Sequence, residues 1–151
     1  MDRGSKPAVL VTGGAGYIGA HTAKALAEEG YFPVVFDSLS SGFREAVRWG
    51  AFVHGDIRDA SGLADAIETY GIRSAIHFAG LIEVGRSVQK PDLFWEHNVA
   101  GTVTLLTVMR DMGVERLVFS SSAAVYGQGA RRPRDHSRGC AQGSGQSLRG
   151  H

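Results

Sequence analysis

The chain has 151 residues, 43% of them hydrophobic, which is enough for one domain with a buried core and too few for two full-sized domains. The net charge of +1 indicates no special partner, and a single cysteine, Cys140, excludes an intrachain disulfide. Met1–Ala8 is polar, and no apolar run approaches the ~18 residues of a membrane span, so we expect a cytoplasmic protein without membrane contact.

Five short runs rich in Val, Ile or Phe have the composition of strands that are buried on both faces. These runs are Ala8–Thr12, Phe32–Asp37, Ala51–His54, Ser74–Phe78 and Arg116–Ser120. Helical patterns lie between most of them, at Tyr17–Glu29, Ala60–Tyr70 and Pro91–Met112. Strands that alternate with helices form right-handed crossovers and a parallel sheet. The sequence therefore predicts an α/β fold with about five parallel strands and flanking helices.

Local signals bound two of these helices. Asp59 precedes Ala60–Tyr70 as a candidate N-cap, and Gly71 follows it as a C-terminal stop. Pro91 opens the last helix, which we expect to stop at Met112, before Gly113.

The end of the chain has a different composition from the rest. Residues 1–127 contain 11 basic and 14 acidic residues, whereas residues 128–151 contain five arginines and one aspartate. The second segment has five glycines and one large apolar residue, Leu148, so it cannot bury enough surface to offset its ordering entropy. We expect a folded unit over 1–127 and a disordered basic tail over 128–151. The tail lacks interleaved aromatic residues, which argues against nucleic-acid binding.

A glycine-rich segment follows the first predicted strand and opens a helix. It reads Gly13-Gly14-Ala15-Gly16-Tyr17-Ile18-Gly19. In such a loop the first glycine permits a tight turn, the second lets the backbone approach a pyrophosphate, and the third allows close helix packing. The helix N-terminus offers N–H groups and a positive dipole end to the phosphates. The segment predicts a Rossmann-type dinucleotide-binding loop, with a ligand-free glycine turn as the alternative.

Asp37 ends the second predicted strand, where dinucleotide-binding proteins carry an acidic residue. A carboxylate at this place can accept hydrogen bonds from a ribose diol and repels a 2′-phosphate. Ser38 follows it, with no arginine that could hold that phosphate. The pattern favours NAD over NADP.

Residues 8–127 resemble the N-terminal part of the UDP-glucose 4-epimerases, a family of extended short-chain dehydrogenases/reductases. The motifs that carry the resemblance are Thr12–Gly19, Gly55–Arg58, His77–Leu81, Val84–Pro91, Asn98 and Phe119–Gly127. The related nucleotide-sugar 4,6-dehydratases typically carry an acidic pair where Ala123 and Ala124 stand here. The resemblance therefore favours epimerisation over dehydration.

The resemblance implies an NAD cofactor, a UDP-sugar substrate, no metal, and a homodimer formed by two helices, of which this chain contains Pro91–Met112. It also implies a role for individual residues. Gly13, Gly16, Tyr17, Ile18 and Gly19 would hold the pyrophosphate; Asp37, Ser38 and Ser41 the adenosine ribose; Asp56 and Ile57 the adenine; Phe78, Ala79 and Gly80 the middle of the cofactor; Asn98 and Ser120 the nicotinamide half; and Ser122 the 4-hydroxyl of the sugar, as a catalytic residue. Ile82 departs from the many members that have a lysine there.

Structural interpretations stand beside several of these roles. Asp56 fits a turn or a helix cap as well as a ligand contact. Asn98 lies on an apolar helix stripe, where a buried and satisfied amide is the usual explanation. His77 lies inside a strand and is better explained by packing than by catalysis.

The family's catalytic base is a tyrosine followed four residues later by a lysine. In this chain Tyr126 is followed by Ala130 at that spacing, and no lysine lies beyond Lys90. The resemblance therefore indicates an epimerase by family whose chain is catalytically incomplete. Two alternatives stay open, an NAD-binding fragment without catalysis and a chain that does not fold stably alone.

Overall fold

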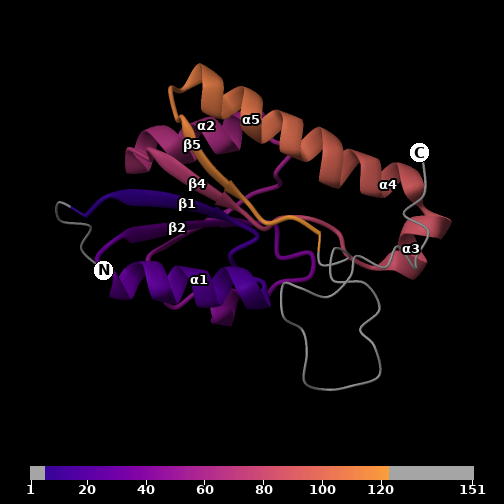
Figure 1. The fold of residues 1–151 in the computed structure, drawn as a ribbon, viewed down its shortest axis with the longest axis horizontal. Helices are drawn as coiled ribbons and strands as arrows, with labels where there is room; N and C mark the ends of the chain where they lie inside the picture. Colours follow the sequence, from indigo (N-terminus) through magenta and orange to yellow (C-terminus); the bar gives the residue numbers. More distant parts are fainter. Residues whose placement is uncertain (1–5, 123–151) are drawn as a thin grey trace, which may run out of the picture. The chain divides into compact units, whose positions relative to one another are not determined.

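The computed structural model describes residues 6–122, drawn in colour in Figure 1. The chain divides into two units, Met1–Phe119 and Ser120–His151, and only Ser120–Ser122 of the second are described. The predicted tail and the motif residues from Ala123 to Gly127 lie outside the described residues. The fold is therefore that of the first unit.

Five parallel strands form one sheet in the order β3-β2-β1-β4-β5, which confirms the predicted α/β sheet. The strands are β1 (Ala8–Thr12), β2 (Phe32–Asp37), β3 (Ala51–His54), β4 (Ser74–His77) and β5 (Arg116–Phe119). The last two end one residue earlier than predicted. In β4 the next residue, Phe78, still donates its N–H to Thr12, where the neighbouring β1 ends.

The helices are α1 (Tyr17–Glu28), α2 (Ala60–Tyr70), α3 (Val84–Gln89), α4 (Pro91–Phe94) and α5 (Gly101–Asp111), with a one-turn 3-10 helix at Arg44–Ala46. The predicted caps of α2 are confirmed. The Asp59 carboxylate accepts the N–H groups of Ser61 and Gly62, and Gly71 adopts the left-handed conformation with φ of 60°.

The helix predicted from Pro91 to Met112 is confirmed as one helical segment, Pro91–Asp111, but it is not α-helical throughout. A π-helical turn, Trp95–Ala100, separates α4 from α5. The Thr102 hydroxyl bonds the Asn98 carbonyl at 2.6 Å, and such back-bonding disturbs regular helices. Apolar periodicity reports which face is buried but not the hydrogen-bond register, so this turn was not visible in the pattern.

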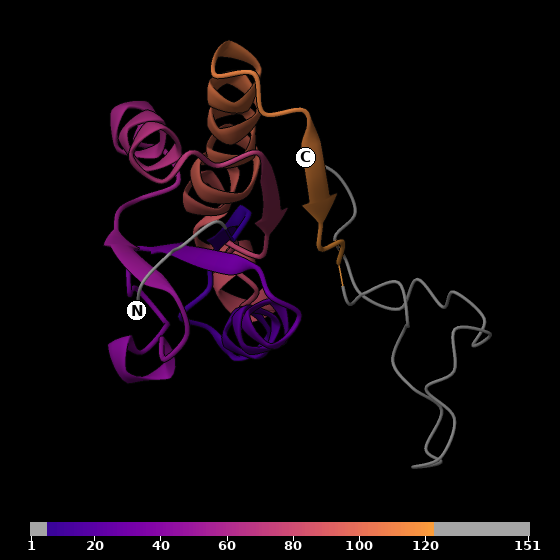
Figure 2. The ribbon, with the colours of Figure 1, turned by 90° about the vertical axis from the view of Figure 1, so that its left-hand side faces the viewer.

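The helices cover the two faces of the sheet unequally. In Figures 1 and 2, α1 lies on one face, and α2 and α5 lie on the other. The larger core packs Leu10 and Val34 of the sheet against Leu63 of α2 and Leu105 of α5. On the α1 face a smaller cluster is built by Val11, Ala23 and Val35, and an open groove lined by Leu26, Ile76 and Val118 lies beside it.

The strand order reverses at the centre of the sheet. From β1 the chain builds outward through β2 to β3, and it then crosses over to β4 on the other side of β1. In open α/β sheets, ligands bind in the crevice that such a reversal leaves at the carboxyl ends of the strands. The fold therefore places the candidate site at the loops that leave β1 and β4. Within residues 6–122 no helix is long and apolar enough to cross a membrane.

Leu63 tests the larger core. Its side chain is fully buried, so Leu63→Ala should lower the free energy of unfolding by about 2–5 kcal/mol in a urea titration followed by circular dichroism. Glu68→Ala, at an exposed position of the same helix, should change it by less than about 0.5 kcal/mol. Equal effects of the two substitutions would show that α2 does not cover a core.

Candidate dinucleotide-binding site

The glycine loop joins β1 to α1 and passes close to the exit of β4. Gly13 has φ of +70°, and a Cβ at this position would lie 2.6 Å from the main-chain nitrogen of Ala79. A Cβ at Gly19 would lie 2.3 Å from the Gly13 carbonyl oxygen. Only glycines allow this turn, and they bring the loop, the start of α1 and the exit of β4 together at the crevice.

The N-terminus of α1 is open to solvent. Its N-cap is Gly16, which has no side chain to cap the helix, and no acidic residue occupies the first turn. Tyr17 and Ile18 are 82% and 60% exposed. N–H groups in the first turn of a helix have no intrahelical acceptor and lie at its positive dipole end. The arrangement can hold an anion such as a pyrophosphate without rearranging the helix.

Asp37 connects the glycine loop to the exit of β2. Its Oδ2 accepts the N–H of Ala15 at 2.9 Å, and its Oδ1 accepts the N–H of Leu39 at 2.8 Å. Each carboxylate oxygen has a further lone pair, so the side chain can also accept hydrogen bonds from a ribose diol. Asp37 thus shapes the loop in addition to the predicted contact with a ligand, and this second role was missed in the sequence.

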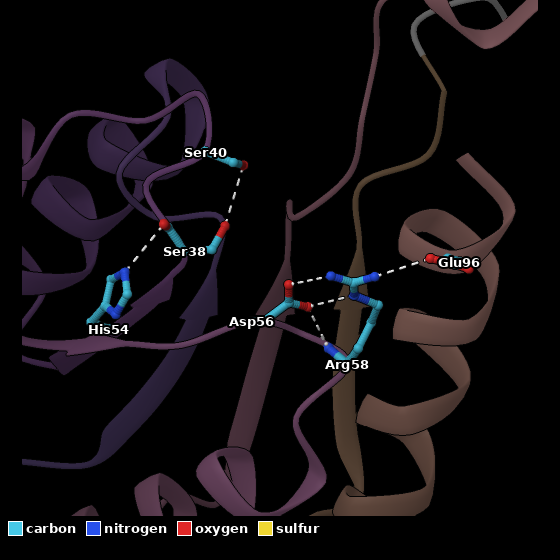
Figure 3. A network of polar contacts seen from close by, with 6 residues as sticks. All are labelled: Ser38, Ser40, His54, Asp56, Arg58 and Glu96. Atoms are coloured by element: carbon cyan, nitrogen blue, oxygen red, sulfur yellow. Dashed lines mark hydrogen bonds and ion pairs between the residues drawn. The ribbon is translucent and has the colours of Figure 1, made fainter. Parts of the chain in front are cut away.

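The loop after Asp37 carries the serines predicted around the ribose. Ser38 donates its hydroxyl to Ser40 at 3.2 Å, and its carbonyl lies 3.2 Å from Nε2 of His54 (Figure 3). Ser41 follows in the same loop and is exposed. The structure therefore brings Ser38 and Ser41 to the same side of the sheet as Asp37, at the carboxyl ends of β2 and β3.

A charged network stands at the exit of β3 (Figure 3). Arg58 donates to both carboxylate oxygens of Asp56, at 2.9 and 2.8 Å, and to Glu96 of the π-helical turn at 3.2 Å. The hydrogen bonds from Arg58 lower the pKa of Asp56 to about 2, and Asp56 in turn raises the pKa of Arg58. Arg58 was assigned no role from the sequence. The signal that could have revealed this ion pair is the spacing of an acidic and a basic residue two positions apart, Asp56 and Arg58.

Ile57, predicted beside the adenine, points its side chain into the larger core. A Cβ on Gly101 of α5 would lie 2.5 Å from Cγ2 of Ile57, so the two elements are in close contact. The Ile57 side chain is therefore a core residue, and its predicted contact with the adenine stays a prediction.

The exit of β4 forms the opposite wall of the crevice and is held by Asn98. The Asn98 Oδ1 accepts the N–H of Leu81 at 2.7 Å, and its Nδ2 donates to the Leu81 carbonyl at 2.9 Å. The satisfied amide expected from the helix stripe is therefore present. Phe78, Ala79 and Gly80 lie between β4 and this clamp, beside the glycine loop.

Ser120 and Ser122 follow β5 in the second unit and are exposed. Their assigned roles stay predictions. Within residues 6–122 no group of three or more His, Cys, Asp or Glu side chains could hold a metal ion. A glycine turn, an uncapped helix N-terminus and a carboxylate at the next strand suit a nucleotide with a diphosphate and a ribose diol.

Comparison with known proteins agrees with this geometry. The model of the "NAD dependent epimerase/dehydratase family" matches residues 9–143, past the boundary at Gly127 that the sequence predicts for the folded unit. The UDP-glucose 4-epimerase of Rhizobium leguminosarum bv. trifolii is 53% identical over 119 residues, which cover 79% of this chain and 36% of that protein. The human UDP-glucose 4-epimerase is 44% identical over 156 residues, covering 92% of this chain and 45% of that protein.

Solved structures are similar over the same part. A UDP-glucose 4-epimerase from Brucella ovis in complex with NAD superposes with a TM-score of 0.77 at 50% identity, covering 84% of this chain and 39% of that one. The enzyme from Thermus thermophilus, in complex with NAD, gives a TM-score of 0.75 at 38% identity, covering 85% and 42%. The chain therefore spans less than half the length of these relatives.

The Asp56 carboxyl group should titrate in the folded chain with a pKa of about 2, measured from its side-chain carbonyl carbon by NMR. Arg58→Gln should raise that pKa toward the ordinary 3.8, because the two side-chain hydrogen bonds are lost. Since the folded-state pKa is depressed, the stability from this pair is present above pH 3.8 and is lost as the pH falls toward 2. Arg44→Gln is the control, because Arg44 stacks on Phe52 instead. An Asp56 pKa that is the same with and without Arg58 would contradict the network.

Proposed function

The chain belongs to the NAD dependent epimerase/dehydratase family, and we propose that it is the N-terminal, cofactor-binding part of a UDP-glucose 4-epimerase. The supporting observation lies where the strand order reverses: the glycine turn and the uncapped N-terminus of α1 adjoin Asp37 there. The parent activity is then the NAD-dependent interconversion of UDP-glucose and UDP-galactose, a step of galactose metabolism. The single cysteine suits a reducing, cytoplasmic location.

The residues of the crevice fit NAD. The N–H groups at the start of α1 would hold the pyrophosphate, with Gly13, Gly16, Tyr17, Ile18 and Gly19 around it. Asp37, Ser38 and Ser41 would surround the adenosine ribose, Asp56 and Ile57 the adenine, Phe78, Ala79 and Gly80 the middle of the cofactor, and Asn98 and Ser120 the nicotinamide half. When bound, NAD supplies an acceptor for the hydride at C4 of the sugar and later returns it.

The chain's own catalytic contribution is limited. Ser122 would orient the 4-hydroxyl of a UDP-sugar, but the proton of that hydroxyl also needs a base. A serine hydroxyl stays protonated at neutral pH, so it cannot act as that base. No tyrosine of this chain has a lysine four residues later, so the family's base element is absent from it. We therefore propose that the 151-residue chain binds NAD without turning over a sugar.

Calorimetric titration should show a wide preference of the chain for NAD over NADP, because Asp37 repels the 2′-phosphate. Asp37→Ala should weaken NAD binding by about 1–3 kcal/mol, since it removes the ribose acceptor and the bond to the Ala15 N–H. Asp65→Ala, at an exposed position of α2, should leave both affinities unchanged. Equal affinities of the unsubstituted chain for NAD and NADP would show that Asp37 does not contact the ribose.

The chain saturated with NAD should form no UDP-glucose from UDP-galactose in a coupled assay on protein free of host epimerase. Loss of general-base catalysis typically costs ~10²–10⁴ in rate. The chain spans less than half the length of its relatives, so contacts that position the substrate should be missing as well. Their loss can raise the activation barrier by up to ~7–11 kcal/mol. A full-length UDP-glucose 4-epimerase serves as the positive control. Clear turnover by the chain would mean that Tyr126 or another group acts as the base.

We also propose that the chain pairs with a second copy through the helical segment Pro91–Asp111. Its exposed apolar side chains Trp95, Val99, Val103 and Leu106 are spaced by four, four and three residues, so they share one face. An apolar stripe of this kind suits a symmetric partner surface. Because it supplies one of the two helices that the family pairs, the association should be weak.

Sedimentation equilibrium should therefore show a monomer–dimer exchange that depends on concentration. Val103→Glu should abolish the dimer, because it places charges opposite each other across a two-fold contact. Val88→Glu, at an exposed apolar position of α3, should not change the exchange. A purely monomeric chain at high concentration, or equal effects of both substitutions, would exclude this surface.

A further inference from the structure

His77 is a buried polar residue whose partners the proposed chemistry does not use. It ends β4 between Thr12 of β1 and Phe119 of β5, and its side chain is 1% exposed. Its Nδ1 lies 2.6 Å from the Thr12 hydroxyl, and its Nε2 lies 3.0 Å from the Thr102 hydroxyl of α5. Burial lowers the pKa of His77, so the ring is neutral at neutral pH.

The direction of each hydrogen bond follows from the bond between Thr102 and the Asn98 carbonyl. The Thr102 hydroxyl lies 2.6 Å from the main-chain oxygen of Asn98, which can only accept, so Thr102 donates its single proton there. Toward His77 the same hydroxyl must then accept, which places the imidazole proton on Nε2. Nδ1 is therefore bare and accepts the proton of the Thr12 hydroxyl.

These contacts connect the two walls of the crevice. Thr12 directly precedes Gly13, and its carbonyl accepts the N–H of Phe78 at 3.0 Å. At the other end, Asn98 holds Leu81 by both its N–H and its carbonyl. A Cβ on Gly80 would lie 3.3 Å from Oδ1 of Asn98, so Gly80 also lies close to the Asn98 side chain.

We propose that His77 is a positioning residue: its neutral imidazole ties the end of β1 to Thr102 and Asn98, and through them it fixes the main chain of Leu81. Because each donor is matched to an acceptor, the distance between the glycine loop and the exit of β4 is set before any ligand arrives. The expected effect on NAD affinity rests on the proposed function, whereas the series of hydrogen bonds from Thr12 to Leu81 does not.

The tautomer can be tested on the unsubstituted chain. Long-range proton–nitrogen NMR correlations at neutral pH should show a neutral His77 ring with the proton on Nε2. A proton on Nδ1, or a charged ring, would overturn the proposal, because the Thr12 hydroxyl would then have no acceptor on His77.

The transmission to Leu81 can be tested with two matched threonines. Thr102→Val removes the hydroxyl that joins His77 to Asn98, and Thr104→Val removes a hydroxyl that bonds the carbonyl four residues earlier, that of Ala100. Thr102→Val should speed hydrogen exchange of the Leu81 N–H by about tenfold or more, while the core amides of Leu10 and Leu63 stay unchanged. Thr104→Val should leave all three unchanged.

Unchanged exchange at Leu81 in Thr102→Val would overturn the proposal, and so would equal effects of the two substitutions. If Thr102→Val loosens the whole fold, the tautomer measurement decides. By calorimetry, Thr102→Val should also weaken NAD binding about tenfold relative to Thr104→Val. If the unsubstituted chain binds no NAD, the proposed function fails, while exchange at Leu81 still decides the role of His77.

Discussion

The structure depends on the close passage of the Gly13 turn against the main chain of Ala79. β1 is the central strand, so the loop that leaves it must clear the exit of β4 on one side and the exit of β2 on the other. A side chain at Gly13 would occupy the space of the Ala79 backbone, and one at Gly19 would occupy that of the Gly13 carbonyl. The same glycine loop leads into α1, whose N-cap is Gly16 and has no side chain to cap the helix. An anion site is the direct consequence of this packing.

Polar side chains hold the walls around that turn. Asp37 bonds the Ala15 N–H from the β2 side, and Asn98 clamps Leu81 from the α5 side. At the exit of β3, Arg58 joins Asp56 to the π-helical turn. Leaving a buried donor or acceptor unpaired costs about 1–3 kcal/mol, so paired groups such as Thr12 and His77 favour one arrangement of these loops. The crevice is thus shaped by the protein itself.

The sequence predicted what local patterns determine. The strands, the caps Asp59 and Gly71 and the glycine turn depend on residues close together in the chain, and the structure has them in place. Contacts between distant residues were missed: Thr12 bonds His77 on the neighbouring strand, and Asn98 bonds Leu81 from a helix that periodicity presented as regular. Asp37 was found by its position, but its bond to Ala15 depends on how β2 lies beside β1. The roles assigned through family resemblance, including those of Ser120 and Ser122, concern ligands and stay predictions.

We propose that the crevice between the glycine loop and Asp37 binds NAD. The most direct measurement is a titration of the isotope-labelled chain with NAD, followed residue by residue in amide NMR spectra. We expect the largest shift changes on Gly13–Gly19 and Leu39, with smaller changes at Ala79 and Gly80. We expect no change at Leu26, Ile76 or Val118, which line the open groove on the α1 face. Changes centred on that groove, or no saturable changes at all, would contradict NAD binding at the glycine loop.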